Sequence, residues 1–485
     1  MPSGAAPPNA RPPLRLGRIP WRLRTHWRSS LRRRLTPPRL LAGSFLVLIA
    51  LGTMGLRWLP GLYTGARLSW LDALFTATSA VCVTGLIVVD TATAFTPLGQ
   101  AFVLLLIQLG GLGMLTLTTA LILVLGRRLS LAQQDASVVG PDVTPDIDFR
   151  SLLRGVLRYT LVLEAIGAGL LFLLWLPRFD VPQAAAHAVF HAVSAFCNAG
   201  FSTFSDSLTG FRTAPVTLTV VMALITLGGV GFLTLEELRL ALRARRHRRP
   251  FRLTLHSRLV LVTSVFLVVG GAALFVPLEW SNSFQDLPAW ARVLNGVFMS
   301  VTARTAGFNT IDYNAADDSS NFVTMLLMSV GGSPGSTAGG LKTTTLALLI
   351  LLAWSRLRGH GVTSWAGRTV PERTVDRAVG LFVVGFAAVL FGIFLMVLFE
   401  LGTSAPVGRG DAFLDYAFEA VSAFNTVGLS MGETASLTVP GKVLVTLLMY
   451  MGRVGPLTVV AAFAIQRRSD RAHEFRFAYE DVVVG

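Results

Sequence analysis

Four stretches of the chain share a pattern in which an apolar run contains a hydroxyl residue and soon afterwards reaches a glycine. The hydroxyl residues are Ser79, Ser194, Thr302 and Ser422, and the glycines are Gly85, Gly200, Gly307 and Gly428. Glycine can adopt backbone angles that turn carbonyl oxygens toward a common axis. Such oxygens can replace the hydration shell of a monovalent cation, so the four stretches are candidate ion ligands.

The composition places these stretches in a membrane. Of 485 residues, 52% are hydrophobic and only 14% are charged, which excludes an ordinary water-soluble domain. Eight apolar runs are long enough to cross the hydrocarbon layer. We expect spans at 40–59, 97–126, 154–177, 215–235, 257–278, 322–354, 375–402 and 439–465.

The net charge of +15 suggests nucleic acid at first, but its distribution favours a membrane topology. Basic residues recur after every second span, as at Arg127-Arg128 and 243–249, whereas Asp72, Asp180 and Asp286 lie in the other connections. We therefore expect no nucleic acid partner, both termini in the cytoplasm, and no signal peptide before the first span.

The glycines are separated by 115, 107 and 121 residues, which indicates four copies of one unit of span, short helix, glycine segment and span. A helix of about a dozen residues is roughly 18 Å long, so it enters the membrane without crossing it. Because each unit crosses twice, all four have one orientation and can surround a single pore in pseudo-fourfold arrangement. The predicted fold is an all-α integral membrane protein with a basic tail at 1–39, repeats at 40–128, 150–245, 255–356 and 372–468, and a C-terminal tail at 469–485.

The sixth span carries a segment that no straight helix would tolerate, since glycine costs roughly 1 kcal/mol and proline about 3 in a helix interior. We expect a loop that faces the aqueous pore, because unpaired backbone is tolerated at membrane depth only there or inside protein. Its residues are Gly331, Gly332, Ser333, Pro334, Gly335, Ser336, Thr337, Ala338, Gly339 and Gly340. A phosphate-binding loop is disfavoured because Leu341 precedes Lys342, where the Walker pattern places the lysine directly after glycine.

Arg453 lies near the middle of the last span, where a charge costs a few kcal/mol, so it is expected to face the cavity and to function there. Lys342 has two alternatives, a contact with the loop or an anchor on the cytoplasmic side. His187 and His191 lie four apart on one helix, and without a third ligand we expect packing rather than metal binding. Cys82 and Cys197 are expected to be small apolar packing groups.

Several glutamates and glycines have simpler interpretations. Glu164, Glu236 and Glu237 are expected near cytoplasmic ends, solvated or paired with arginines. The glycines at 110–113 and 228–231 are expected to permit close helix packing. An enzyme is disfavoured, because no constellation of nucleophile, base and metal ligands is visible.

Taken together, the four pore segments, the loop GGSPGSTAGGLKTTT, the line MYMGRVGPLT and the ending YEDVVVG resemble the Trk/Ktr/HKT superfamily of potassium transporters, and above all its Ktr-type membrane subunits. The resemblance extends over residues 40–485. It implies a selectivity filter for K⁺ whose residues are Val83, Thr84, Gly85, Leu86, Asn198, Ala199, Gly200, Phe201, Thr305, Ala306, Gly307, Phe308, Thr426, Val427, Gly428 and Leu429. A serine in place of the first glycine goes with sodium selectivity in plant relatives, so glycine at all four positions favours potassium.

The resemblance also implies the remaining parts of the system. Residues 331–340 resemble a gate beneath the filter, with Arg453 close to it. The expected assembly is a homodimer in the inner (plasma) membrane, docked on a cytoplasmic nucleotide-binding ring of the KtrA type, with no organic cofactor in this chain. The basic segment 243–249 could contact that ring or anionic lipid. A Trk-type transporter, or one coupled to Na⁺, is the alternative.

Overall fold

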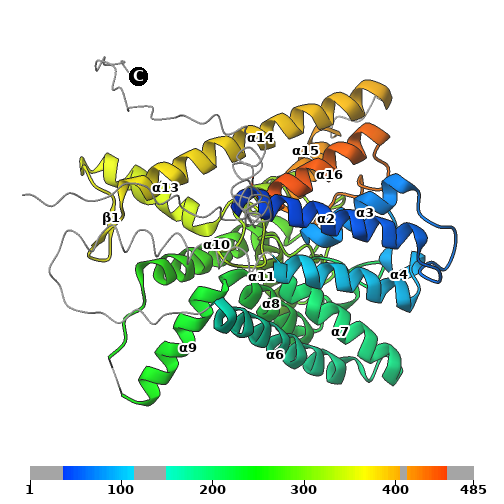
Figure 1. The fold of residues 1–485 in the computed structure, drawn as a ribbon, viewed down its shortest axis with the longest axis horizontal. Helices are drawn as coiled ribbons and strands as arrows, with labels where there is room; N and C mark the ends of the chain where they lie inside the picture. Colours follow the sequence, from blue (N-terminus) through cyan, green and yellow to red (C-terminus); the bar gives the residue numbers. More distant parts are fainter. Residues whose placement is uncertain (1–36, 114–148, 249, 405–411, 456–485) are drawn as a thin grey trace, which may run out of the picture.

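The computed structural model describes residues 37–113, 149–248, 250–404 and 412–455, and they are predominantly helical (Figure 1). Helices dominate because a membrane offers no partner for unpaired backbone groups. Among the described residues the strands are β1 (Ser364–Trp365) and β2 (Arg368–Thr369), a small antiparallel hairpin.

Each of the four sequence units contains a long first helix, a short helix and a second helix. The first helices are α2 (Pro37–Trp58), α6 (Phe149–Trp175), α10 (Leu255–Glu279) and α14 (Glu372–Ser404). The short helices are α3 (Trp70–Cys82), α7 (Val181–Cys197), α11 (Ala289–Thr302) and α15 (Ala412–Asn425). The second helices are Pro97–Gly113, α8 (Pro215–Val230), α12 (Asp318–Met328) and α16 (Val439–Val454).

Four described helices are long and apolar enough to cross a membrane, and the pair of α8 and α9 (Phe232–Arg246) passes the same test together. The four are Leu41–Trp58, Arg154–Trp175, Leu255–Glu279 and Glu372–Leu401. The predicted span 97–126 begins as a helix, and its part after Gly113 lies outside the described residues. The predicted span 439–465 also begins as a helix, which ends at Val454, and its part after Gly455 lies outside the described residues. Most of the tail 1–39 and all of the tail 469–485 lie outside them too.

The predicted span 215–235 is not one straight helix. It breaks at Gly231, and α9 leaves α8 at an angle of 104°. Gly231 has φ +88°, a left-handed conformation that glycine adopts without steric cost. After the break α9 carries glutamates and arginines, and Figure 1 shows it leaving the other helices. Gly231, which was expected to permit close helix packing, therefore also allows the break in this span.

The predicted span 322–354 is interrupted as expected. Helix α12 ends at Met328, α13 (Thr343–Leu357) begins beyond the glycine-rich segment, and residues 331–340 form an irregular connection between them. A parallel bridge between Val330 and Leu341 holds its two ends together, so the segment returns to its starting point.

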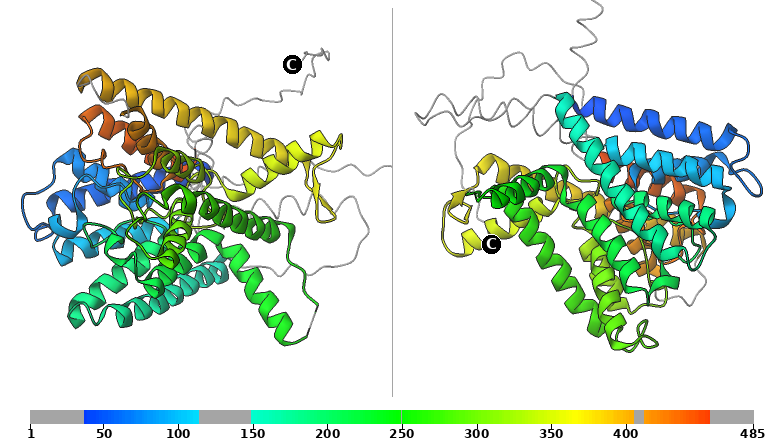
Figure 2. Two further views of the ribbon diagram at one scale, coloured as in Figure 1. Left: turned by 180° about the vertical axis from the view of Figure 1, so that it is seen from behind. Right: turned by 90° about the horizontal axis from the view of Figure 1, so that it is seen from below.

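Neighbouring units contact one another in chain order. In each unit the first helix contacts the short helix. Three short helices also contact a second helix of another unit: α3 contacts α16, α11 contacts α8, and α15 contacts α12. The remaining short helix, α7, approaches Pro97–Gly113 so closely that a methyl group on Gly111 would lie 2.7 Å from Cys197 Sγ. Figures 1 and 2 show the N-terminal helices α2 and α3 beside α16, where the first and fourth units meet.

Candidate functional site

The four short helices all lead into backbone of unusual conformation. Val83, Asn198, Thr305 and Thr426 have φ between 51° and 69°, in the left-handed region. Three of them are β-branched, for which this conformation is rare and costs of order 1–3 kcal/mol, so the surrounding contacts must hold it in place. Two residues further on, the four glycines also have positive φ, from 68° to 96°. This alternation is shared by all four segments.

The glycines lie in a closed ring that follows the chain order. A methyl group placed on any of them would come within 3.0 Å of a carbonyl oxygen of the next segment. The oxygens that Gly85, Gly200, Gly307 and Gly428 face belong to Ala199, Ala306, Val427 and Thr84, respectively. The fourth segment therefore meets the first. No side chain fits between the segments, which explains why the sequence has glycine at each position.

The hydroxyl residues hold the glycine segments in place. Ser79 Oγ donates to the carbonyl of Leu86 at 2.7 Å and accepts from the amide of Gly85 at 3.1 Å. Ser194 donates to Phe201 at 2.7 Å, and Thr302 to Phe308 at 2.6 Å. Ser422 accepts from the amide of Gly428 at 3.1 Å. Each hydroxyl therefore braces the backbone around its glycine from the short helix behind it.

A cavity of about 290 Å³ opens beside the ring, lined by all four glycines. Asp90 and Asp312 also line it. Asp90 accepts from Ser205 Oγ at 2.6 Å, which fixes its carboxylate at the cavity wall. Carboxylates in a confined space raise the local concentration of cations, so the cavity is suited to attract a monovalent cation toward the ring.

The segment 331–340 lies against the ends of two short helices. Thr337 donates through its hydroxyl to the carbonyl of Phe196 in α7 at 3.1 Å. On the other side, a methyl group on Gly339 would collide with the hydroxyl of Thr426, and one on Gly340 would lie 2.9 Å from Asn425 Oδ1. The segment therefore lies next to residues of two of the four glycine segments.

The same segment is joined to the break between α8 and α9. The amides of Ser333 and Thr337 donate to Gly229 and Gly228 at 2.9 and 3.2 Å, and the Phe232 amide donates to Gly335 at 3.0 Å. Ser333 Oγ also donates to the carbonyl of Val230. These bonds satisfy backbone groups left unpaired by the break, as burial requires.

Arg453 is buried, with 1% of its surface exposed. Its guanidinium donates to the carbonyl of Thr337 in the segment and to that of Gly110, at 3.2 Å, in another unit. Lys342 Nζ donates to the carbonyl of Ala338 at 2.7 Å, so this lysine contacts the loop itself. Both residues line a cavity of about 120 Å³ that also includes Gly340.

One polar cluster was not expected from the sequence. Glu164 is 5% exposed and accepts from Gln108 Nε2 at 3.1 Å, and Cys197 Sγ lies 3.8 Å from its other oxygen. The prediction of a solvated or arginine-paired Glu164 is therefore wrong. Its position within a long apolar helix was a signal, since a carboxyl group there needs a buried partner.

The histidines belong to an aromatic cluster. His191 packs against Trp175 and Phe204, with ring centroids 5.1 and 4.7 Å away, and its Nε2 lies 2.9 Å from Ser202 Oγ. His187 Nδ1 lies 2.6 Å from Thr203 Oγ1. This is the predicted packing role. Throughout the described ranges, no three His, Cys, Asp or Glu side chains gather as metal ligands.

Comparisons with known proteins agree on one group. The family model TrkH, described as cation transport protein, matches residues 16–475. The potassium/sodium uptake protein NtpJ of Enterococcus hirae is 36% identical over 464 residues, 95% of this chain and 100% of that protein. The Ktr system potassium uptake protein B of Bacillus subtilis is 35% identical, over 90% of this chain and 95% of its own.

A solved structure supports the fold. The crystal structure of the potassium transporter TrkH from Vibrio parahaemolyticus superposes with a TM-score of 0.68 at 18% identity. The superposition covers 87% of this chain and 83% of that one. At this low sequence identity, the similarity is evidence for the fold alone.

Proposed function

The chain belongs to the TrkH family of cation transport proteins, and from this premise we propose that it is the ion-conducting membrane subunit of a potassium uptake system. The observation that carries the proposal is the closed ring of four glycines with positive φ, each against a carbonyl oxygen of the next segment. The TrkH family transports cations, and the relative from Bacillus subtilis is named for potassium uptake.

In this proposal the selectivity filter consists of residues 83–86, 198–201, 305–308 and 426–429. A potassium ion leaves the cavity beside Asp90 and Asp312, loses water, and is coordinated by the carbonyl oxygens of the filter. The bracing hydroxyls keep these oxygens in place. Entry is driven by the membrane potential, about 2.3 kcal/mol per charge for each 100 mV.

The arrangement proposed around the filter is pseudo-fourfold, with eight spans in four repeats. It is supported by the chain-order contacts between short helices and second helices, and by the ring that closes between Gly428 and Gly85. Unbroken helices occupy the four predicted first spans, and Pro97–Gly113 and α16 occupy the beginnings of the second spans of the first and fourth units. The second spans of the second and third units are broken at Gly231 and at 331–340.

We assign the gate to residues 331–340. The segment lies next to Thr426 and the end of α7, and Arg453 ties it to Gly110 in another unit. Opening would require these bonds to break or exchange. In the closed state the positive charge of Arg453 would also raise the energy of a cation on the path, and an entering ion would compete for the carbonyl of Thr337.

The proposed assembly is a homodimer in the plasma membrane with a nucleotide-binding ring on the cytoplasmic side. The names of relatives, which speak of a Ktr system, support an assembly of several components, and the basic end of α9, which carries Arg243, Arg245 and Arg246, offers a contact surface for the ring. The ring would bind nucleotide, and this chain would bind only ions and lipid.

Transport coupled to sodium is the second candidate. The relative from Enterococcus hirae is named a potassium/sodium uptake protein, which favours a role for both ions. A channel and a coupled transporter differ in their reversal potential, since only the coupled transporter shifts it when the sodium gradient changes alone.

The first test is uptake of rubidium and sodium by vesicles that contain the purified protein, compared with the variant Gly85→Ser. We expect selective rubidium uptake by the natural protein. The variant should lose uptake or admit sodium as well, because a side chain at Gly85 would collide with Ala199 and Gly200.

The matched control is Gly169→Ala, because a methyl group on this glycine of α6 meets nothing within 4 Å. It should leave rubidium uptake unchanged. Equal uptake of rubidium and sodium by the natural protein and by Gly85→Ser would contradict the assignment of the filter.

A further inference from the structure

Two of the four glycine segments are tied to the short helix behind them at a second point, just beyond the glycine. Two residues after the glycine, the second and fourth segments carry Ser202 and Ser430, and both serines line the cavity of about 290 Å³ beside the ring. Each serine is bonded to a fully buried polar residue that lies three positions before the bracing hydroxyl. These residues are His191 in α7 and Glu419 in α15. The proposed function assigns no role to either of them.

In the second unit, His191 holds the backbone that follows Gly200. Its Nδ1 lies 2.8 Å from the carbonyl oxygen of His187, which can only accept, so in the neutral ring Nδ1 carries the proton. Nε2 is then an acceptor, and Ser202 Oγ donates to it at 2.9 Å. Ser202 Oγ accepts in turn from the Phe204 amide at 2.9 Å. The imidazole therefore fixes the turn at 202–204 through one serine, a role beyond packing.

In the fourth unit, Glu419 holds the corresponding turn with more bonds. Ser430 Oγ and the Met431 amide both donate to one carboxyl oxygen, the amide at 3.2 Å. Thr434 Oγ1 donates to the other oxygen at 2.7 Å. As in the second unit, the serine hydroxyl accepts from the amide two residues further on, that of Gly432, at 2.9 Å. One buried side chain therefore gathers three donors of the turn at 430–434.

The first and third units are built differently at these positions. The corresponding residues are Thr76 and Ile87 in the first unit, and Met299 and Asn309 in the third. Within the described part of the chain, Thr76 Oγ1 has no hydrogen-bond partner, and the side-chain amide of Asn309 donates to Ile311 at 2.9 Å rather than to its own short helix. The second and fourth units, which carry the extra support, alternate with the other two around the ring.

The first and third segments are instead tied to the second unit. Ser205 Oγ donates to Asp90 of the first unit at 2.6 Å. Ser207 Oγ accepts from the amide of Asn309 of the third unit at 3.2 Å. Both serines follow directly after the turn that His191 holds. This turn therefore supports its two neighbours as well as its own segment.

We propose that His191 and Glu419 are positioning residues that fix the backbone beyond the glycine ring and thereby set the preference for K⁺ over Na⁺. The inference rests on the proposed function. Carbonyl oxygens favour the larger ion when their spacing cannot contract around the smaller one. Buried polar groups whose hydrogen bonds are all formed hold a single geometry. Because the two supported segments alternate with the others, every filter segment lies next to a supported one.

The test compares variants that keep these bonds with variants that remove them. Glu419→Gln keeps an oxygen for Ser430 and Met431, and it presents an NH₂ group to the Thr434 hydroxyl, which can accept it. Glu419→Leu and His191→Leu remove the bonds. The matched control is Thr76→Val, which removes a buried hydroxyl without a described hydrogen-bond partner at the equivalent position of the first unit.

Amide hydrogen exchange, followed by mass spectrometry in detergent, reports the turns directly. We expect peptides that contain residues 430–434 to exchange several-fold faster in Glu419→Leu, and at the natural rate in Glu419→Gln and Thr76→Val. His191→Leu should have the same effect on residues 202–204. Peptides from α10 are the internal reference for a general loss of stability. Unchanged exchange of both turns in the two leucine variants would overturn the support.

Thermal unfolding in detergent then measures ion preference without transport. An ion that binds only the folded protein raises the midpoint, and a buffer of N-methylglucamine gives the stability of each variant without such an ion. We expect K⁺ to raise the midpoint more than Na⁺ in the natural protein, Glu419→Gln and Thr76→Val. Glu419→Leu and His191→Leu should lose this difference.

The outcomes separate the inference from the proposed function. Equal protection of the natural protein by K⁺ and Na⁺ contradicts the proposed filter, and the inference fails with it. If the natural protein prefers K⁺ and both leucine variants keep this preference, the positioning role alone is wrong. A preference lost in Glu419→Gln as completely as in Glu419→Leu also overturns that role, because the charge of the carboxyl group, and not its bonds, then decides.

Discussion

At the scale of single residues, the glycine ring depends on hydroxyl groups that the backbone cannot replace. Ser79 both donates to Leu86 and accepts from Gly85, so one side chain satisfies two backbone groups of a buried segment. Ser194 and Thr302 make the corresponding bond to a carbonyl, and Ser422 makes the corresponding bond from the glycine amide. The hydroxyl and the glycine therefore form a single structural unit in each repeat.

Replacing this hydroxyl tests the unit. Ser79→Ala leaves the Leu86 carbonyl and the Gly85 amide without their buried partner, which costs about 1–3 kcal/mol of stability. We expect a lower midpoint of thermal unfolding in detergent and a weaker preference for rubidium over sodium. The control is Ser281→Ala, at an exposed position. Unchanged selectivity in Ser79→Ala would show that the hydroxyl does not shape the filter.

Arg453 offers a second test at this scale. Arg453→Gln removes the charge and shortens the reach toward Thr337 and Gly110. If Arg453 holds the gate closed, rubidium uptake should increase and depend less on the ion concentration. Arg453→Lys, which keeps the charge but loses the paired donors, separates the two effects. Unchanged flux and ion dependence in Arg453→Gln would contradict a role of Arg453 in gating.

At the scale of elements, the break between α8 and α9 is coupled to the segment 331–340. Gly231 has positive φ, and a methyl group there would lie 2.5 Å from Ser333 Oγ and 2.9 Å from the carbonyl of Pro334. The backbone at the break and the backbone of the segment 331–340 therefore satisfy each other's hydrogen-bonding groups. Neither a continuous α8–α9 helix nor a free loop would preserve these contacts.

Gly231→Ala should therefore displace the segment 331–340, the proposed gate. Alanine in the left-handed region costs about 1–2 kcal/mol, and the collision with Ser333 adds to this. We expect reduced stability together with altered rubidium uptake. Gly270→Ala is the matched control, because its methyl group meets nothing within 4 Å and alanine is favoured in a helix. Wild-type uptake by both variants would contradict the coupling.

At the scale of the whole molecule, the first and the fourth units are joined by direct contacts. Helix α16 contacts α3, and Lys442 Nζ lies 2.9 Å from Asp72 Oδ1 across this junction. The Tyr450 hydroxyl adds a bond to the carbonyl of Ala42 at 2.9 Å. These contacts join residues 370 and 408 positions apart, and they accompany the contact that places Gly428 against Gly85.

The ion pair at this junction predicts a dependence on pH. Partial burial opposes the charged form, but hydrogen bonds from Lys442 and Ser69 lower the pKa of Asp72, which lies in the first turn of the short helix α3. Because the pKa is lower in the folded state, the carboxylate stabilises the fold at pH values above its unfolded pKa of about 3.9. This stabilisation is lost as the pH falls through the folded pKa. Because the pair is partly exposed, the contribution should be about 0.5–1 kcal/mol.

Asp72→Asn should therefore unfold at a lower temperature than the natural protein at pH 7, and the difference should vanish at strongly acidic pH. Thermal unfolding in detergent across this range provides the measurement. Lys442→Met should remove the same contribution, and the double variant should cost little more than either single one. Additive losses would mean that the two residues stabilise the protein independently.

The sequence by itself determined what depends on local backbone and on composition. Apolar runs of sufficient length predicted helices in a membrane, glycine and proline predicted the interruption at 331–340, and the recurrence of hydroxyl and glycine predicted four equivalent segments. These features are readable because each follows from the conformational limits of a few neighbouring residues. The same limits apply in any surrounding structure.

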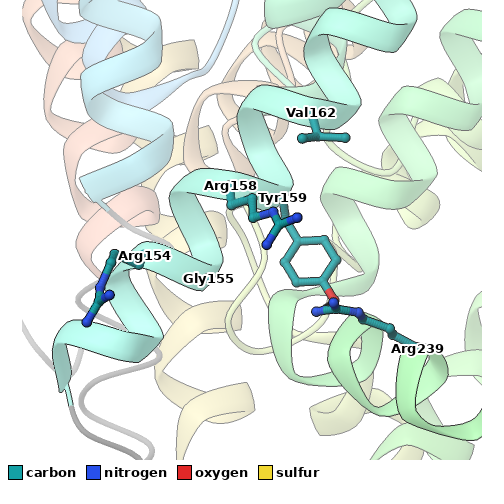
Figure 3. A pocket seen from close by; sticks show the side chains of 6 residues that line it. All are labelled: Arg154, Gly155, Arg158, Tyr159, Val162 and Arg239. Atoms are coloured by element: carbon teal, nitrogen blue, oxygen red, sulfur yellow. Dashed lines mark hydrogen bonds between the residues drawn. The ribbon is translucent and has the colours of Figure 1, made fainter. Parts of the chain in front are cut away.

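Only the tertiary structure decided which distant residues meet. The break at Gly231, the burial of Glu164 beside Gln108 and Cys197, and the bridge from Arg453 to Thr337 and Gly110 depend on contacts between separate units. A pocket between α6 and α9 likewise exists only because α9 turns away by 104° (Figure 3). Such contacts depend on how helices pack, which periodicity and composition do not specify.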